Sequence, residues 1–305
     1  MFRTILLAAL LTAVGLSASA RPRLRTEKGP DGKSLNFYVE DKDYPGMMTV
    51  LMNFSDVKNC DLTDGIRYFV VRNSGERLLT LRPLDNQKNI RYKLLCRFME
   101  GAVDRMFDST FVYRMPCQTG RPVRISGTVN ILDKYREKKP REPLGYFFQL
   151  EKGDTVYAMR RGLVVDIKQS EVPAEERPQY NYTSRSAKIT VEHADGTRAW
   201  YVNFDPDHVF VNTGDDILPG MPLGLAGTYD GERYGISVQL YRYESDPRAA
   251  TDTTPVLRRL TMRFATEEGI VIPHGPGKYT PVMTDEMLTR EMTKKERKKL
   301  RAGNK

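Results

Sequence analysis

The chain has 305 residues, with 48 Lys and Arg against 39 Asp and Glu, which gives a formal net charge of +9. Much of this charge belongs to residues 290–305, where eight Lys and Arg stand against Glu291 and Glu296, a net of +6. Because the charge is not spread over a folded face, the composition argues against a nucleic-acid-binding protein. No segment after residue 20 is apolar over the length that a transmembrane helix requires, so none is predicted.

The first twenty residues have the pattern of a secretory signal peptide. A basic start, Met1-Phe2-Arg3, precedes the apolar run Thr4–Leu11, and the small residues Ala18-Ser19-Ala20 fit a cleavage site. The apolar run is too short to span a bilayer, and a buried helix is the alternative interpretation. We expect cleavage after Ala20 and a mature protein that is periplasmic or secreted.

Residues 21–139 are expected to form a β-sandwich of immunoglobulin-like type. Short runs with alternating apolar side chains follow one another from Leu35 to about Val129, and Asn73-Ser74-Gly75 has the composition of a hairpin turn. About seven short strands at such spacing suggest a sandwich. The runs include Met48–Phe54, Tyr68–Val71, Leu78–Leu81, Ile90–Phe98, Phe111–Met115 and Val123–Ser126.

Three cysteines in an exported chain leave at least one of them unpaired. Cys96 lies on an apolar strand face and is expected to be a buried small hydrophobe. Cys60 and Cys117 stand beside turn residues, so they are the favoured pair if one disulfide forms. No His lies in the same predicted domain to activate a thiolate, which argues against a cysteine nucleophile.

Residues 140–283 form the second predicted domain, after a charged linker over Lys134–Glu142. Its short apolar-alternating runs end in Gly or Asp-Gly turns, which is typical of antiparallel strands and hairpins. Along Ile189–His193 the apolar side chains share one face, and Asp195-Gly196 supplies the two residues of a type I′ turn. Two further strands, Val256–Phe264 and Glu268–Pro273, are expected to close this core or to return to the first domain.

The polar span Gln169–Ser186 interrupts this β pattern and is expected to be a surface loop. Its Tyr180-Asn181-Tyr182 cluster has two interpretations. The aromatic rings either anchor the loop by packing or stack on a sugar ring.

Three blocks of the second domain carry a family resemblance. They are Gly153–Val165 (GDTVYAMRRGLVV), Ile189–Gly196 (ITVEHADG) and Val211–Gly227 (VNTGDDILPGMPLGLAG). Their order and content resemble the β-sheet core of the LytM-type (M23) zinc peptidases of bacterial cell walls. The resemblance covers about a third of the chain and implies an antiparallel LytM-like core. Function has to be argued from the site.

At the site this sequence departs from the family. The zinc-binding His and Asp that precede the first strand correspond to Pro143 and Phe147, and the His-x-His pair of the last strand corresponds to Gly235 and Ser237. The catalytic His of a further segment corresponds to Asn203. A catalytic zinc needs about three protein donors, and neither Ser nor Asn titrates near neutral pH as a general base must. We therefore predict no catalytic residue, no metal site and no cofactor, with zinc only under the alternative of an active enzyme.

The chain has three histidines, and each has an ordinary structural interpretation. His193 is expected to be a hydrogen-bonded strand residue, while His208 and His274 lie among loop residues. A metal site formed by His193, Asp195 and His208 is the alternative. It is disfavoured because the turn already explains Asp195 and no surrounding pattern of polar residues supports such a site.

Residues 284–305 are predicted to be one basic helix, with Asp285 and Glu286 in its first turn and no breaker before Gly303. The expectation for this tail is a solvated end. Contact with anionic lipid or glycan is the alternative.

Taken together, the sequence favours an exported pseudo-peptidase of the cell envelope that binds a cell-wall hydrolase, another envelope protein or peptidoglycan, and regulates cell-wall hydrolysis. An active M23-type zinc endopeptidase and a purely structural envelope scaffold are the alternatives. In the favoured interpretation the former active-site groove is a neutral, largely apolar cleft suited to a peptide or a partner segment. By the resemblance it is lined by Tyr146, Phe147, Asn203, Tyr234, Ser237 and Gln239.

Overall fold

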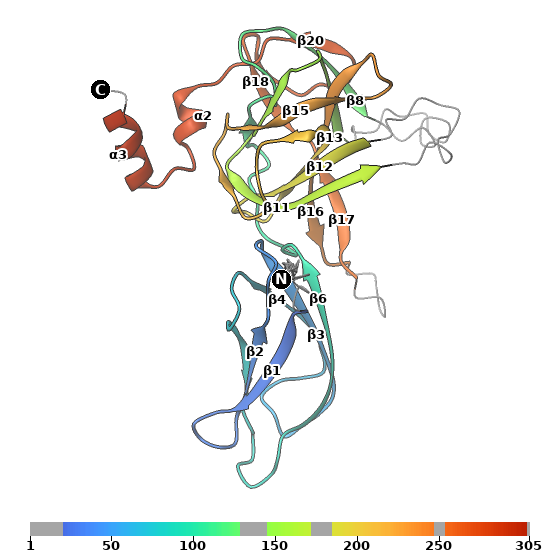
Figure 1. Cartoon of the computed structure of the whole chain (residues 1–305). Coiled ribbons are helices and arrows are strands. Elements are labelled where there is room, and N and C mark those ends of the chain that lie inside the picture. The colour runs from blue at the N-terminus through green and yellow to red at the C-terminus, as the bar shows by residue number, and fades with distance from the viewer. Residues whose placement is uncertain (1–20, 129–144, 172–184, 247–253, 304–305) are drawn as a thin grey trace, which may run out of the picture.

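The computed structural model describes residues 21–128, 145–171, 185–246 and 254–303, and Figure 1 shows a nearly all-β chain. The predicted all-β fold class is confirmed. Among the described strands only β7 (Val112–Tyr113) and β18 (Arg263–Thr266) pair in parallel. Three predicted features lie outside the described residues: the signal peptide over 1–20, the whole charged linker Lys134–Glu142, and the Tyr180–Tyr182 cluster.

The first unit, residues 23–100, consists of two three-stranded antiparallel sheets that share one hydrophobic core (Figure 1). Alternation places Phe37, Val50, Phe54 and Leu81 in this core, each at most 1% exposed. One sheet has the order β1-β2-β5 and the other β4-β3-β6. The strands are β1 (Arg23–Lys28), β2 (Leu35–Glu40), β3 (Met48–Lys58), β4 (Gly65–Val71), β5 (Arg77–Leu81) and β6 (Arg91–Glu100).

This unit is smaller than the sandwich predicted from the sequence. The runs Phe111–Met115 and Val123–Ser126 were expected in it, but they pair with strands of the second half. The physical reason is burial, since Tyr113, Val123 and Ile125 belong to the hydrophobic core of the large sheet. The predicted domain boundary itself, between residues 139 and 140, lies outside the described residues.

The favoured disulfide is not formed, because its two cysteines lie in different cores. Cys60 packs in the core of the first unit and Cys117 in the core of the large sheet, and all three cysteines are free thiols. Cys96 is half-buried on β6, and burial raises its pKa to about 11. The thiol is therefore protonated near neutral pH and poorly reactive.

The second half is built on one 11-stranded antiparallel sheet centred on β16 (Tyr234–Glu244). This strand pairs with four others, β9, β13, β15 and β17. Its Ile236, Val238 and Leu240 point into the core, so Ser237 and Gln239 point to the opposite face. The further strands of this sheet are β8 (Val123–Thr128), β9 (Gly145–Leu150), β10 (Thr155–Tyr157), β11 (Gly162–Glu171), β12 (Arg185–Glu192), β13 (Arg198–Val209), β14 (Asp216–Ile217), β15 (Pro222–Thr228), β17 (Val256–Leu260) and β20 (Gly277–Tyr279).

The predicted strand Val256–Phe264 is interrupted near Thr261 and gives β17 and β18. The first half of the run extends the large sheet beside β16, while β18 pairs with β7 and with β19 (Gly269–Val271). Phe264 is fully buried under Tyr146 and Phe148, with ring centroids at 5.3 and 5.6 Å. The segment therefore closes the large core, as one of the two expectations had it.

The β12–β13 hairpin differs from the predicted type I′ turn. Only Gly196 has a positive φ, of 85°, and Asp195 does not. His193 and Thr197 close the loop through the bond from the His193 N–H to the Thr197 carbonyl, at 2.8 Å. Three residues therefore lie in the loop, and a glycine in the left-handed region at the third is the usual form of such a loop. Asp195 has no positive φ. Its side chain instead accepts hydrogen bonds from the Thr197 amide and hydroxyl.

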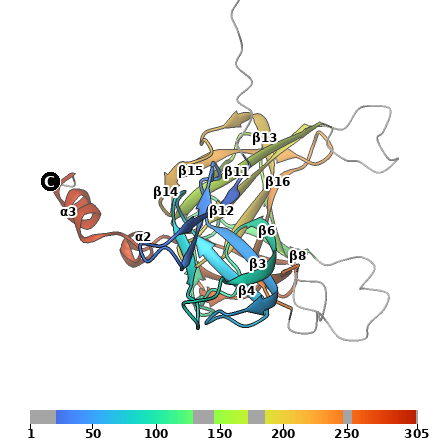
Figure 2. The ribbon, with the colours of Figure 1, turned by 90° about the horizontal axis from the view of Figure 1, so that it is seen from below.

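The basic tail is two helices rather than one. Helix α2 (Asp285–Thr289) is capped by Thr284, whose side chain accepts from the Met287 N–H, and α3 (Lys294–Gly303) begins after a break. Thr293 and Glu296 form a reciprocal capping box at this second start. Figures 1 and 2 both show α3 standing away from the β units. None of the described helices is long and apolar enough to cross a membrane.

The first unit contacts the large sheet through a buried carboxylate. Glu192 is 4% exposed, and its Oε1 accepts a 2.6 Å hydrogen bond from the Met47 N–H. Burial raises the pKa of Glu192 from 4.5 to about 7, against the opposing effects of this hydrogen bond and nearby cations. The nearest guanidinium atom, Arg198 Nε, is 3.5 Å away but makes no hydrogen bond to the carboxylate.

We predict that the stability of the Glu192→Gln variant relative to the wild type rises with pH. A raised carboxyl pKa means that the folded chain holds a proton that the unfolded chain has lost. Stability is therefore lost as the pH rises from 4.5 through about 7, and this loss amounts to about 3 kcal/mol. The difference in unfolding free energy between variant and wild type, measured by urea denaturation, should grow in favour of Gln over this range.

The comparison of the Glu192→Gln variant with the wild type isolates the effect of the Glu192 carboxyl on stability, because every other titrating group is common to both proteins. Glu232→Gln is the matched control, since it removes the same charge from an exposed turn and should give a flat difference curve. A flat curve for Glu192→Gln would contradict the prediction.

Candidate functional site

The face predicted as a groove is the outer side of β9, β13 and β16. Ser237 stands opposite Phe147 on one neighbouring strand and opposite Val202 on the other. These three side chains therefore form one row across the sheet. Tyr146 does not belong to this row, because successive side chains of a strand point to opposite faces. Its side chain is 0% exposed and packs on Phe264 in the core.

Phe147 fills the space above Gly235. A Cβ atom built on Gly235 would lie 2.6 Å from the Phe147 ring and 2.4 Å from the carbonyl oxygen of Phe148. Both distances are far below van der Waals contact. The ring is held in place by an edge-to-face contact with Tyr229, with centroids 4.9 Å apart. Two positions that the resemblance assigns to the metal site are thus a phenyl ring and the glycine that makes room for it.

Asn203, which the resemblance aligns with a catalytic histidine, bonds to the backbone in this structure. It is 4% exposed and has a φ of 86°, in the left-handed region. Its Nδ2 donates 3.0 Å hydrogen bonds to the carbonyl oxygens of Gly227 and Gly235. The side chain therefore joins β13 to β15 and β16, and it is too deeply buried to line an accessible groove.

The other predicted groove residues divide into two places. The Ser237 hydroxyl lies 3.2 Å from the Tyr229 hydroxyl, and Gln239 lies two residues further along the same face. Burial raises the pKa of Tyr229, so its hydroxyl stays protonated as a hydrogen-bond donor. Tyr234 is separate, because it lines a different hollow of about 360 Å³ together with Lys152 and His208.

A hollow of about 400 Å³ lies beside Phe147. The guanidinium of Arg124 and the ammonium of Lys278 give it a positive charge, while Ser126 and Gln149 offer neutral polar groups. Sequence reasoning missed Arg124, because β8 was assigned to the first domain. Pairing of β8 with β9 and β20 brings both cations to this face. The structure thus gathers Phe147, Ser237 and Gln239 with a cationic hollow.

The residues of this face do not fit a catalytic zinc ion. Phe147 and Gly235 have no donor atom, and the Asn203 amide nitrogen is committed to two carbonyls. Ser237 alone cannot supply the three donors that such a site requires. Pro143 lies outside the described residues. Within the described ranges, no three His, Cys, Asp or Glu side chains are grouped so that they could hold a metal ion.

The alternative metal site is also not assembled. Asp195 is engaged by Arg160, Nη1 to Oδ2 at 2.7 Å, and His208 is bound to Asp205 at 2.9 Å. His193 is 1% exposed, and its Nδ1 lies 2.7 Å from the Arg161 carbonyl oxygen. Burial and the charge of Arg160 lower the pKa of His193 to about 3. The imidazole is therefore neutral, and its Nδ1–H donates to that carbonyl.

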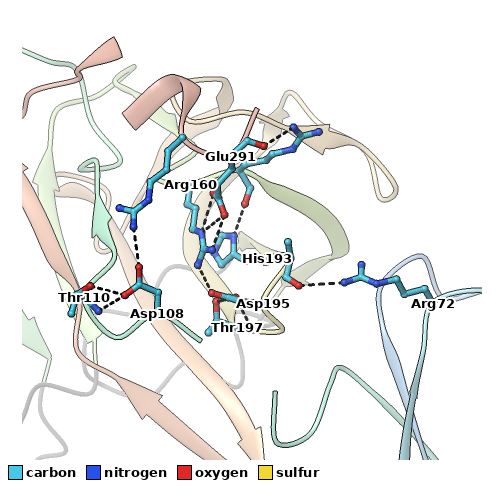
Figure 3. A network of polar contacts seen from close by, with 11 residues as sticks. Arg72, Asp108, Thr110, Arg160, His193, Asp195, Thr197 and Glu291 are labelled. Carbon is cyan, nitrogen blue, oxygen red and sulfur yellow. Dashed lines mark hydrogen bonds and ion pairs between the residues drawn. The ribbon is translucent and has the colours of Figure 1, made fainter. Parts of the chain in front are cut away.

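The polar network around His193 attaches the C-terminal tail to the large sheet (Figure 3). The buried Arg160 guanidinium binds Glu291 through Nε and Nη2, with distances of 2.7 to 3.1 Å, and lies 4.0 Å from the centre of the Phe111 ring. Arg290 stacks on the same ring and pairs with Asp108 at 2.9 Å. This arrangement has the form of a structural clamp, with every charged member paired.

No family model matches the chain, and no curated protein sequence matches it. Several solved structures are similar to it. The catalytic domain of the antimicrobial peptidase lysostaphin from Staphylococcus simulans is 18% identical, with 41% of this chain and 79% of that chain covered and a TM-score of 0.26. The M23 metalloprotease pseudoalterin from the deep sea is 15% identical, with coverages of 50% and 98% and a TM-score of 0.27.

Helicobacter pylori Csd3 is 10% identical, with 92% of this chain and 83% of that chain covered and a TM-score of 0.30. At these identities and TM-scores, the similarities do not by themselves establish an activity for this chain. The chemistry has to come from its own residues.

We predict that Gly235→Ala destabilises the fold by about 1–3 kcal/mol, because overpacking against a backbone carbonyl forces the strands apart. Denaturant unfolding measures the loss. Gly275→Ala is the control, since nothing lies within 4 Å of a Cβ built there, and it should be close to neutral. Equal stability of the two variants would show that Gly235 is not the tight position described above.

We predict that Asn203→Ala costs about 2–4 kcal/mol, because two buried hydrogen bonds are lost and the left-handed backbone no longer has an Asn to favour it. Ser237→Ala, on the same face but half-buried and with its hydroxyl 3.2 Å from that of Tyr229, should cost less than about 1 kcal/mol. Thermal and denaturant unfolding of both variants check the difference. A stable Asn203→Ala protein would instead leave the side chain free for a role in binding.

Proposed function

We propose that this protein is a non-catalytic LytM-like protein of the cell envelope, whose face around Phe147 binds a partner or peptidoglycan and regulates cell-wall hydrolysis. The observation that supports the proposal is the contact between Phe147 and Gly235. A ring occupies the place where the family resemblance puts zinc ligands, and the strand beneath it leaves no room for a side chain. The protein is proposed to act in the periplasm or outside the cell, on the basis of residues 1–20.

The chemistry of the face favours a peptide with free carboxylates. Arg124 and Lys278 provide cations at one hollow, and Gln149 can both donate and accept hydrogen bonds there. Phe147 and Tyr229 supply the aromatic surface that anchors binding partners. Peptidoglycan stem peptides and acidic segments of a hydrolase both have this chemistry.

The test is binding of the purified protein to peptidoglycan sacculi and to cell-wall amidases, with amidase digestion of sacculi as the functional readout. We predict that Arg124→Glu with Lys278→Glu lowers binding at least about tenfold, since two attractive charges become repulsive. Arg91→Glu with Arg97→Glu makes the same charge change on exposed positions of β6 and should leave binding intact. Circular dichroism establishes that both variants fold.

Two outcomes would overturn the proposal. Stoichiometric zinc in the purified protein, together with chelator-sensitive cleavage of muropeptides, would make it an active peptidase. If the folded wild-type protein binds neither sacculi nor any amidase, the role is that of a structural scaffold.

A further inference from the structure

Two of the four acidic residues of the tail, Glu291 and Glu296, pair with arginines of the large sheet's half. Glu291 forms the bidentate pair with Arg160, and Glu296 pairs with Arg161 at 2.8 Å (Figure 3 shows the Arg160 pair). Hydrogen bonding to Arg161 lowers the pKa of Glu296 to about 2, so this carboxylate stays ionised at any physiological pH. The cations of α3 are thereby left without an acidic partner on their own helix.

The geometry of α3 separates an attached side from a cationic side. Glu296 and Leu300 are four residues apart and lie on one side, where Glu296 meets Arg161. Both are half-buried, whereas five of the cationic side chains of α3 are exposed. At about 100° per residue, these exposed side chains cover the opposite arc of the helix. They are Lys294, Lys295, Arg297, Lys298 and Lys299.

This arrangement costs the helix stability unless a counter-charge approaches. Lys294 and Lys298 are like charges at the i, i+4 spacing, and so are Lys295 and Lys299. Two of these lysines also lie in the first turn, where the helix dipole disfavours positive charge. No salt bridge is formed by the four lysines within the described part of the chain. An external polyanion would relieve both repulsions.

The side chains also limit the class of polyanion. The exposed side of α3 has no aromatic ring that could stack on a base or a sugar. It is mostly lysine, whose ammonium is a point charge without the planar fork of arginine. Recognition by charge alone suits a flat surface of phosphates, in which no single group has to be placed. The helix also projects from the β units (Figures 1 and 2).

We propose that α3 is a membrane-surface contact, which adsorbs to anionic phospholipid headgroups while the Arg160 and Arg161 pairs hold it to the large sheet. The helix carries too few apolar residues to insert, so the adsorption is electrostatic. It would hold the cationic hollow beside Phe147 near a membrane, but it does not depend on the function proposed for that hollow.

The experiment is co-sedimentation of the purified mature chain with phosphatidylcholine vesicles, with and without phosphatidylglycerol. We expect binding only to the anionic vesicles, and loss of this binding in near-molar salt because the Debye length then falls to about 3 Å. Replacing Lys294, Lys295, Lys298 and Lys299 by Ala should weaken partitioning at least about tenfold, since each cation near an anionic leaflet contributes several-fold. Alanine preserves the helix.

The matched control replaces Lys58, Arg91, Arg97 and Lys152 by Ala, which removes the same charge from exposed positions elsewhere. This control should retain wild-type partitioning. Equal losses in both variants would show a nonspecific charge effect, and no binding by the wild type would exclude the contact. Equal binding of the wild type to vesicles with and without phosphatidylglycerol would show that the anionic headgroup is not what α3 recognises. Each of these three results overturns the proposal.

Discussion

The contact between Phe147 and Gly235 is the constraint on which the candidate face depends. Two strands can pair this closely under a phenyl ring only because one of them has no side chain at that point. The Phe147 ring contacts Tyr229, and the Tyr229 hydroxyl bonds to that of Ser237. Each of these three side chains therefore positions the next one. The Asn203 side chain donates a hydrogen bond to the carbonyl oxygen of the same glycine, Gly235. The absence of a side chain at residue 235 therefore makes room for the ring of β9 on this face.

A second set of contacts holds together parts that are distant in the chain. Arg160 binds both Asp195 and Glu291, and Glu291 lies 131 residues after Arg160 in the chain. Arg161 binds both Asp216 and Glu296. The two adjacent arginines thus attach the segment between α2 and α3, and the first turn of α3, to the half that contains the large sheet. Since Arg160 is 4% exposed, removing one of its carboxylates would leave a buried charge short of a partner. The tail is consequently a part of the fold and not a free extension.

Local patterns in the sequence predicted the strands well, and failed where pairing is non-local. Alternation along Ile236–Leu240 identifies the inner and outer faces of β16, and the same rule applied to Tyr146 and Phe147 would have removed Tyr146 from the groove. The spacing of Thr293 and Glu296 would have revealed the second helix start. By contrast, nothing local to β8 tells that it pairs with β20, some 150 residues away. Arg124 and Lys278 therefore could not be placed on the candidate face.

The candidate face also differs from a metal site whose ion has been lost. Side chains that surround a metal ion are polar, and without the ion they would be left as buried donors and acceptors lacking partners, which is costly. Here the corresponding positions need no ion. The Asn203 amide nitrogen has two carbonyl acceptors, the Ser237 hydroxyl has Tyr229, and Phe147 has an aromatic neighbour. A side chain at residue 235 would require both the ring and a backbone carbonyl to move. The face thus presents aromatic and cationic groups whose hydrogen-bonding and packing needs are met within the protein.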